Sequence, residues 1–358
     1  MGSNIYSVIT GTGSYIPTRR VPNDYFLNHQ FIDAKGNAYD KTNAEIIEKF
    51  EEITGIKERR YVTDDLMASD IGYFAAEKAI DDAGIDPETL DYIIFAHNFG
   101  DVRSDNKRVD MVPSLAARVK HKLKIKNPEC VAYDLPFGCP GWLQGVIQSD
   151  YYLKSGDARR ALVIGAETLS RICDPHDRDS MIYSDGAGAT VLEATESDKP
   201  VGILSHAARS DAANEAWLLN MGTAEHKEED TLYLKMKGHK LYVYALTNVP
   251  GAVKKSIDQA GLDIDDITKV LIHQANEKMD EAIMQRVFKL YGKNHMPDDV
   301  MPMTISWLGN SSVATIPTML DLMLHDKLEH HVLDSGNSVV FSSVGAGMNI
   351  NSVVYRMP

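Results

Sequence analysis

The sequence has few cysteines, no long apolar run and no excess of positive charge, and each absence excludes a class of protein. Three cysteines among 358 residues have no metal-binding spacing, and their odd number argues against a disulfide framework, so we expect a reducing cytoplasm and no metal site. No apolar stretch approaches the roughly 18 residues of a membrane span. The net charge of -14 disfavours nucleic-acid binding, which requires Lys and Arg to neutralise phosphates. We therefore expect a protein that binds neither membranes nor nucleic acids.

What the chain does contain is an alternation of two patterns. Apolar runs rich in β-branched residues are interleaved with longer amphipathic stretches, which is typical of α/β architecture. The expected strands are 5–16, 91–99, 161–167, 188–194, 269–275 and 338–345, and a further apolar strand leads up to Cys139. The expected helices are 68–84, 113–124, 141–155, 240–261 and 277–291.

Two distant segments of the chain resemble each other. Residues 69–97 and 245–275 each read as a helix, a glycine stop, an Asp-containing turn and a strand. Glycine ends such helices because it adopts a left-handed conformation without strain. Coincidence within an α/β chain is the alternative, but duplication explains the pattern better. The polar stretch at 196–200 is the expected boundary, giving units 1–196 and 197–358.

Cys139 stands where an expected strand gives way to Gly-Cys-Pro-Gly and then to a helix. Pro140 suits a first helical turn because the N–H it lacks would be unpaired there. The free N–H groups and the positive end of the helix dipole favour a thiolate, which is the form a nucleophilic cysteine needs. The alternative is an inert buried cysteine, since cysteine is among the most buried residue types.

Two polar residues stand near the ends of other expected elements. His273 follows an apolar strand, at the edge where α/β proteins place their sites. Asn310 lies in a Gly-Asn-Ser-Ser turn before a helix. Taken singly, His273 could be a structural histidine and Asn310 an ordinary turn or N-cap residue.

Together, these segments resemble the signatures of β-ketoacyl-acyl-carrier-protein synthase III, in the thiolase superfamily. The resemblance implies a thiolase-like fold of duplicated αβαβα halves with mixed five-stranded sheets. It covers most of the chain, and the segments that carry it are ITGTGSYIP, TGIKERR, the turn around Cys139, LVIGAETLSRICDPHDRDSMIYSDGAGATVLEA, HQAN, GNSSVATIP and SSVGAGMNINSVVY.

The resemblance implies a two-stage reaction without a tightly bound cofactor. Cys139 takes an acyl group from a thioester, usually acyl-CoA; malonyl-acyl carrier protein then loses carbon dioxide, and its enolate attacks the acyl group. His273, as a neutral imidazole, and Asn310 are implied to donate hydrogen bonds to the enolate oxygen. The backbone N–H groups of Cys139 and Ala346 are implied to bind the tetrahedral oxyanion. Ala346 replaces the central glycine of a common Gly-Gly-Gly.

The implied substrate contacts include further departures from the family pattern. Arg178 matches an arginine that packs near the CoA adenine, and a guanidinium suits that role. Lys49 and Ile53 stand where a tryptophan and an arginine are usual. Either CoA or the phosphopantetheine arm of a carrier protein is therefore an expected acyl donor.

The resemblance also implies protein partners. Carrier docking is expected on the helix after HQAN, where Lys278, Arg286 and Lys289 fall roughly on one face; a solvated helix face is the alternative. A homodimer is implied, in which the loop at 98–113 reaches into the partner's acyl tunnel. Val112 replaces a bulky aromatic of many relatives there, which predicts a longer or branched primer; the alternative is that Met111 and Phe99 refill the volume. Val344 is expected in the same tunnel.

Three hypotheses of different classes follow. The first is a chain-initiating condensing enzyme. The second is an acyltransferase or a specialised polyketide or aromatic lipid synthase that uses the same acyl-Cys intermediate, which the unusual DLPFGCPGW and VGAGMN favour. The third is a silent scaffold, which the three intact polar residues disfavour. A Cys/His/Asn hydrolase uses the same side chains, but the residues of the motifs around them disfavour it.

Overall fold

The computed structural model describes residues 4–33, 35–226 and 231–358. Two mixed sheets dominate it. The first has the strand order β1-β9-β8-β4-β7, with bounds β1 Asn4–Tyr15, β9 Asp185–Ser197, β8 Arg160–Thr168, β4 Tyr92–His97 and β7 Val131–Pro136. The second has the order β10-β15-β14-β13, with bounds β10 Gly202–Ser210, β15 Asn349–Arg356, β14 Ser338–Gly345 and β13 Ile267–Ile272.

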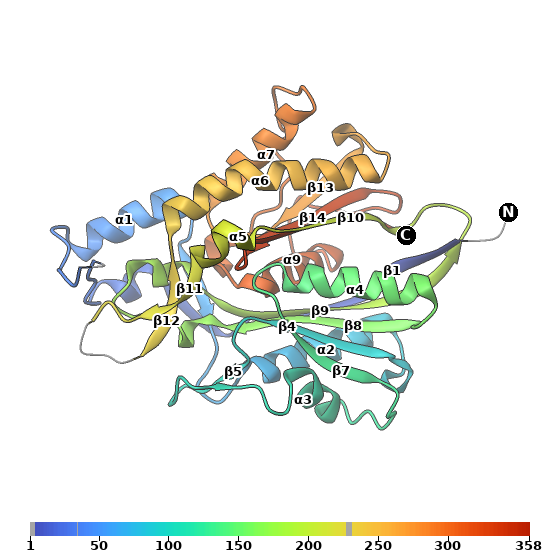
Figure 1. Ribbon diagram of the computed structural model, residues 1–358, viewed down its shortest axis with the longest axis horizontal. Helices are drawn as coiled ribbons and strands as arrows, with labels where there is room; N and C mark the ends of the chain where they lie inside the picture. The colour runs from blue at the N-terminus through green and yellow to red at the C-terminus, as the bar shows by residue number, and fades with distance from the viewer. Residues whose placement is uncertain (1–3, 34, 227–230) are drawn as a thin grey trace.

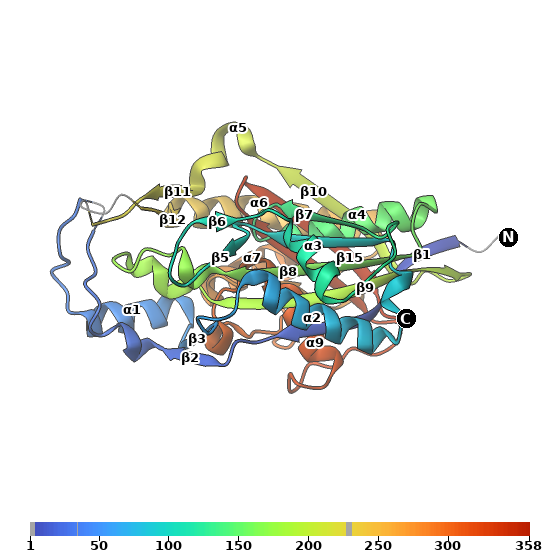
Figure 2. The ribbon, with the colours of Figure 1, turned by 90° about the horizontal axis from the view of Figure 1, so that it is seen from below.

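Helices form three layers around the two sheets (Figure 1). The central layer contacts both sheets, and the outer layers cover one sheet each. The central helices are α4 Gly141–Ser155 and α9 Thr315–Leu324; those on the first sheet are α2 Ala68–Ala83 and α3 Leu115–Lys122; those on the second are α6 Gly238–Gln259 and α7 Glu277–Leu290. Figure 2 shows α2 and α3 lying across the first sheet. The expected layered α/β fold is therefore confirmed.

The internal duplication is visible in the order of the elements. α2 leads through a short 3-10 helix, Pro87–Thr89, into β4, and α6 leads through Ile264–Asp266 into β13. An aspartate, Asp86 or Asp263, caps each short helix by accepting a hydrogen bond from a backbone N–H. β4 and β13 also hold the same place in their sheets, next to β8 and β14.

One detail of the expected fold is wrong, because the second sheet has four strands among the described residues, not five. The chain around Val300 runs beside β13, and the Val300 carbonyl accepts a hydrogen bond from Val270 N at 2.8 Å. Pro302 follows two residues later and has no N–H to continue a ladder. This edge of the second sheet therefore stays irregular.

The division of the chain at residue 196 stays a prediction. β9 ends at Ser197 and β10 begins at Gly202, so the proposed boundary falls on a turn. No helix among the described residues is long and apolar enough to cross a membrane.

Several of the remaining elements lie at the end of the molecule opposite the N-terminus (Figures 1 and 2). The bounds of the remaining elements are α1 Asn43–Thr54, β2 Arg19–Pro22, β3 Glu58–Tyr61, β5 Asp101–Val102, β6 Val109–Asp110, α5 Ala212–Glu215, β11 Leu219–Thr223, β12 Leu232–Met236 and α8 Ile305–Leu308. Helix α1 begins with a reciprocal cap, in which Thr42 and Glu45 each accept a hydrogen bond from the other's backbone N–H.

Candidate active site

Cys139 lies between the carboxyl end of β7 and the first residue of α4. Gly138 adopts a left-handed φ of 75°, and Pro140 is the residue that precedes the helix. Burial raises the pKa of the Cys139 thiol to about 11, although the hydrogen bond from Ser312 and the Cys139 N–H lower it. Burial thus favours the thiol, and activation of Cys139 by the helix N-terminus stays a prediction.

His273 directly follows β13, as the sequence predicts. Its backbone N–H donates to the Ser342 carbonyl at 2.8 Å, while its side-chain Nδ1 is buried and has no partner among the described residues. Burial lowers the pKa of His273 to about 4. The imidazole is therefore neutral near pH 7 and carries one N–H that can be donated.

Gln274 fixes the turn beyond His273. Its side-chain nitrogen donates to the Pro302 carbonyl at 2.7 Å, and its oxygen accepts from Thr304 N at 2.9 Å. These bonds tie the end of β13 to the chain that leads to Asn310.

Hydrogen bonds of its backbone fix the position of Asn310. Its N–H donates to the Ile182 carbonyl at 3.0 Å, and its carbonyl accepts from Ser184 N at 2.8 Å. Its side-chain Oδ1 accepts from Ser312 N at 2.8 Å. With its oxygen engaged, the amide group has its nitrogen left for a ligand.

A cavity of about 50 Å³ brings the three predicted residues together. Cys139, His273 and Asn310 all line it, although they come from three distant parts of the sequence. Most of the other wall residues are apolar, and they include Phe99, Leu169, Leu234, Val344 and Met348. The chain therefore places a thiol and two hydrogen-bonding groups around one small, largely apolar space.

The turn between β14 and β15 packs its backbone against the Cys139 loop. A Cβ atom added at Gly345 would lie 2.7 Å from Cys139 N, and one added at Gly138 would lie 3.0 Å from Ala346 N. Glycine at both positions thus lets the two backbone segments approach. The Ala346 carbonyl accepts from Asn349 Nδ2 at 2.8 Å, which fixes the turn.

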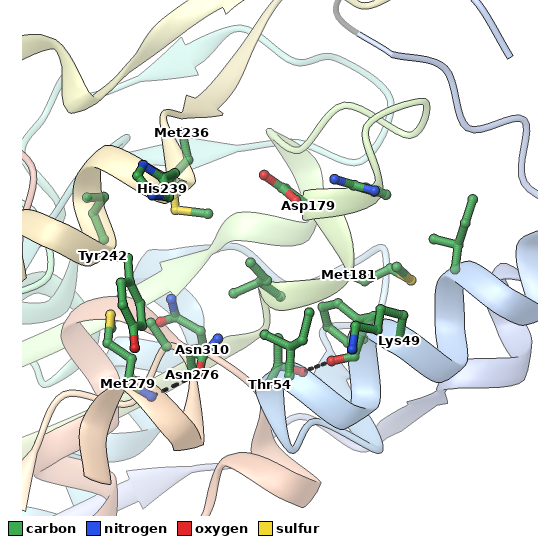
Figure 3. Close-up of a pocket in the computed structure, with 18 of the residues that line it drawn as sticks. Lys49, Thr54, Asp179, Met181, Met236, His239, Tyr242, Asn276, Met279 and Asn310 are labelled. Atoms are coloured by element: carbon green, nitrogen blue, oxygen red, sulfur yellow. Dashed lines mark hydrogen bonds between the residues drawn. The ribbon is translucent and has the colours of Figure 1, made fainter. Parts of the chain in front are cut away.

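A second, larger cavity has a volume of about 540 Å³, and Figure 3 shows the side chains that line it. Met236, Leu241 and Asn310 line both, so the two spaces are adjacent. Side chains from α1, α6, α7 and the 3-10 helix Arg178–Ile182 surround the larger cavity. No group of three His, Cys, Asp or Glu side chains in the described part of the chain could hold a metal ion.

Arg178, Lys49 and Ile53 all line this larger cavity. The Arg178 guanidinium lies 4.9 Å from the centre of the Tyr39 ring, so the chain itself covers one of its faces. Lys49 pairs with Glu52 at 2.8 Å.

The remaining predicted residues lie outside the two cavities, apart from Val344. Val112 is 87% exposed and does not line the cavity of its own chain. On α7, Lys278 is 57% exposed and 3.9 Å from Glu52, Arg286 donates to the Leu246 carbonyl at 2.7 Å, and Lys289 is exposed.

Sequence reasoning missed three polar residues beside Cys139. Ser312 donates to Cys139 Sγ at 3.2 Å, Asn98 Nδ2 donates to Ser312 Oγ at 3.1 Å, and Glu167 accepts from Asn98. A signal was available, because Asn98 and Glu167 stand at the carboxyl ends of expected strands and Ser312 is two residues from Asn310.

Comparison with known proteins agrees with this geometry. A family model described as 3-oxoacyl-[acyl-carrier-protein (ACP)] synthase III matches residues 133–212, and the model of its C-terminal part matches residues 257–357. A β-ketoacyl-[acyl-carrier-protein] synthase III from Vibrio vulnificus is 32% identical, covering 98% of this chain and 100% of the relative. One from Xanthomonas campestris is 31% identical, covering 99% and 100%. This chain belongs to the 3-oxoacyl-[acyl-carrier-protein] synthase III family.

Solved structures place this synthase III family member in the thiolase-like fold. The enzyme of the same name from Pseudomonas aeruginosa superposes with a TM-score of 0.80 at 27% identity, over 99% of this chain and 98% of that one. A priming β-ketosynthase of the R1128 polyketide pathway superposes with a TM-score of 0.81 at 24% identity, over 100% and 98%, and shows the fold alone.

Proposed function

We propose that this chain is a decarboxylating condensing enzyme that joins an acyl group held on Cys139 to a malonyl unit carried by acyl carrier protein. The observation that carries the proposal is the convergence of Cys139, His273 and Asn310 on one cavity of about 50 Å³. Membership of the synthase III family supports the same chemistry.

In the first stage, Cys139 sulfur attacks the thioester carbonyl. The carbonyl oxygen becomes an oxyanion, for which we propose the backbone N–H groups of Cys139 and Ala346 as donors. The tight approach of these two segments supports this assignment. When the intermediate collapses, the donor's sulfur leaves and the proton of the Cys139 thiol ends on it, giving acyl-Cys139 and a free thiol.

In the second stage, the malonyl thioester loses carbon dioxide and negative charge develops on its thioester oxygen. The neutral His273 and the free nitrogen of Asn310 are the proposed donors to that oxygen. Two fixed donors in an apolar cavity stabilise the charged transition state more than the neutral malonyl thioester. The resulting enolate carbon attacks the acyl carbon, and the bond to Cys139 Sγ breaks.

The larger cavity is the proposed channel for the phosphopantetheine arm of the substrates. Lys41, Lys49 and Arg178 line it beside the carboxyl groups of Glu45 and Asp179, and the guanidinium of Arg178 suits a phosphate. Because Tyr39 already stacks on Arg178, less of the guanidinium is left for a CoA adenine. CoA and carrier-protein thioesters therefore both remain proposed donors.

We also propose that the chain forms a homodimer in the cytoplasm. β7 is the edge strand of the first sheet, and its outer edge pairs with no described strand. A free edge of this kind can pair with the β7 of a second copy. The three free cysteines suit a reducing compartment. Sedimentation as a single chain would contradict the dimer.

Intact-protein mass spectrometry tests the first stage. The protein is incubated with acyl-CoA and acyl-carrier donors from two to twelve carbons, beside a Cys139→Ala control. We expect one acyl group per chain on the wild type and none on the control. Acyl mass that persists in Cys139→Ala would rule out Cys139 as the nucleophile.

The same panel tests primer length. The cavity of about 50 Å³ favours short primers in the single chain, whereas Val112 in a partner's tunnel predicts longer or branched ones. Malonyl-carrier is then added, and release of carbon dioxide with a β-ketoacyl product is expected. Acylation without release of carbon dioxide would favour the alternative, an acyltransferase or a specialised polyketide or aromatic lipid synthase.

A further inference from the structure

A chain of hydrogen bonds runs from a buried carboxyl group to the sulfur of Cys139. Glu167 Oε1 accepts from both the backbone N–H and the side-chain Nδ2 of Asn98. Asn98 Nδ2 also donates to Ser312 Oγ at 3.1 Å, and Ser312 Oγ lies 3.2 Å from Cys139 Sγ. Glu167 lies in β8, Asn98 directly follows β4, Ser312 begins the 3-10 helix Ser312–Ala314 before α9, and Cys139 lies in the loop before α4.

The directions of these bonds follow from the groups themselves. The backbone N–H of Asn98 donates to Glu167 Oε1, and with the Glu167 proton absent or on Oε2 the Asn98 group that shares this oxygen is the NH₂. The second hydrogen of that NH₂ points to Ser312 Oγ, which therefore acts as an acceptor there. The single hydroxyl hydrogen of Ser312 is left for Cys139 Sγ.

The backbone of Ser312 supports a dedicated role. Its φ of 55° lies in the left-handed region, where a residue other than glycine is strained. Its N–H is held by Asn310 Oδ1 at 2.8 Å. Strain of this kind persists where the surroundings demand a particular side-chain direction.

We propose that Ser312 is a further catalytic residue, which donates a hydrogen bond to the Cys139 sulfur, and that Asn98 and Glu167 are positioning residues that orient its hydroxyl. This assignment rests on the proposed function. The hydroxyl acts twice: it stabilises the sulfur as a thiolate nucleophile, and it stabilises the same sulfur as a leaving group when the enolate displaces it and the electron pair of the S–C bond returns to sulfur. No proton is transferred from Ser312 in either step.

The charged groups around this chain are few. Burial raises the pKa of Glu167 to about 7, and His97 and Asp185 are the ionisable residues that act on it. Glu167 in turn raises the pKa of Cys139 when it is charged. A direct donor to the sulfur therefore opposes both burial and the nearby carboxylate.

The test measures alkylation of Cys139 by iodoacetamide between pH 7 and 10, which needs no natural substrate. Ser312→Gly is the main variant, because glycine suits a φ of 55° and is expected to fold at least as well as the wild type. It should lower the alkylation rate at pH 8 by about tenfold or more and move the profile to higher pH, since it removes a charge-assisted hydrogen bond. Asn98→Ala should act in the same direction by a smaller factor.

Ser311→Ala is the matched control, because the Ser311 hydroxyl bonds to Thr315 Oγ1 at 3.4 Å and not to Cys139. It should stay within about twofold of the wild type. A folded Ser312→Gly protein with the wild-type alkylation profile would overturn the proposal. Acylation assays that fail with every primer while the alkylation profile shifts would instead count against the proposed function.

Discussion

At the residue scale, the buried carboxyl of Glu167 gives the protein a pH-dependent stability. Its pKa rises to about 7 because burial disfavours the charged form. The folded state therefore keeps a proton that the unfolded chain loses above its ordinary pKa near 4.5, so the free energy of unfolding falls as pH rises between about 4.5 and 7. Asp185, whose pKa burial raises to about 6, acts in the same direction.

Glu167→Gln should remove this dependence. Gln keeps an oxygen that accepts from Asn98 but cannot ionise. From pH 5 to pH 8 the free energy of unfolding of the wild type should therefore fall by about 1–3 kcal/mol more than that of the variant. Chemical denaturation at the two pH values measures it, with exposed Glu48→Gln as the control. An equal change in the wild type and in Glu167→Gln would show that Glu167 does not titrate in this window.

At the element scale, the turn between β14 and β15 can pack against the Cys139 loop because Gly345 has no side chain. Gly345→Ala would put a Cβ atom 2.7 Å from both Cys139 N and Pro140 Cδ. We expect a loss of about 1–3 kcal/mol of stability from overpacking, and at least a tenfold loss of acylation rate as the oxyanion donors move apart.

Gly251→Ala is the matched control for that substitution. Gly251 lies within α6, and a Cβ atom added there meets nothing within 4 Å. Because alanine favours a helix over glycine, the control should be neutral or gain about 0.5–1 kcal/mol. Stopped-flow acylation and thermal unfolding measure both variants, and an unchanged acylation rate in Gly345→Ala would contradict the assignment.

At the scale of the whole molecule, which has a net charge of -14, we propose that the lysines of α7 dock an acidic carrier. Lys278 and Lys289 are exposed on α7, which also carries the exposed Glu281. A double Lys278→Glu, Lys289→Glu variant should raise the KM for malonyl-carrier by about tenfold, with the rate from small acyl thioesters unchanged, because only docking of an acidic carrier is affected. The effect should weaken at high salt.

Lys199→Glu is the control for docking, since Lys199 is exposed in the turn between β9 and β10. It changes the net charge in the same direction without touching α7. Steady-state kinetics with carrier-bound and small substrates separates the two effects. An equal rise in the KM for malonyl-carrier in Lys199→Glu and in the α7 double variant would show that net charge, and not the α7 face, controls binding.

The sequence by itself determined many of the longer elements and pointed to the three central residues, but it did not reveal β10, β15 or α1. Periods of 2 and 3.6 residues are local, so β4, β8, β14, α2, α4 and α7 could be predicted close to their observed bounds. Cys139, His273 and Asn310 could be named because each follows or precedes such an element and because the motifs that contain them resemble those of a known family.

Only the tertiary structure decided how those residues behave. Glu167, Asn98 and Ser312 meet because three separate parts of the chain converge, and Asn98 and Ser312 are 214 positions apart in the sequence. The pKa of Cys139 is raised mainly by burial, which depends on how much water the surrounding elements exclude. Likewise, the missing fifth strand reflects how Val300 meets β13, which no single segment encodes. Local pattern specifies the elements, but solvation and long-range contact decide the chemistry.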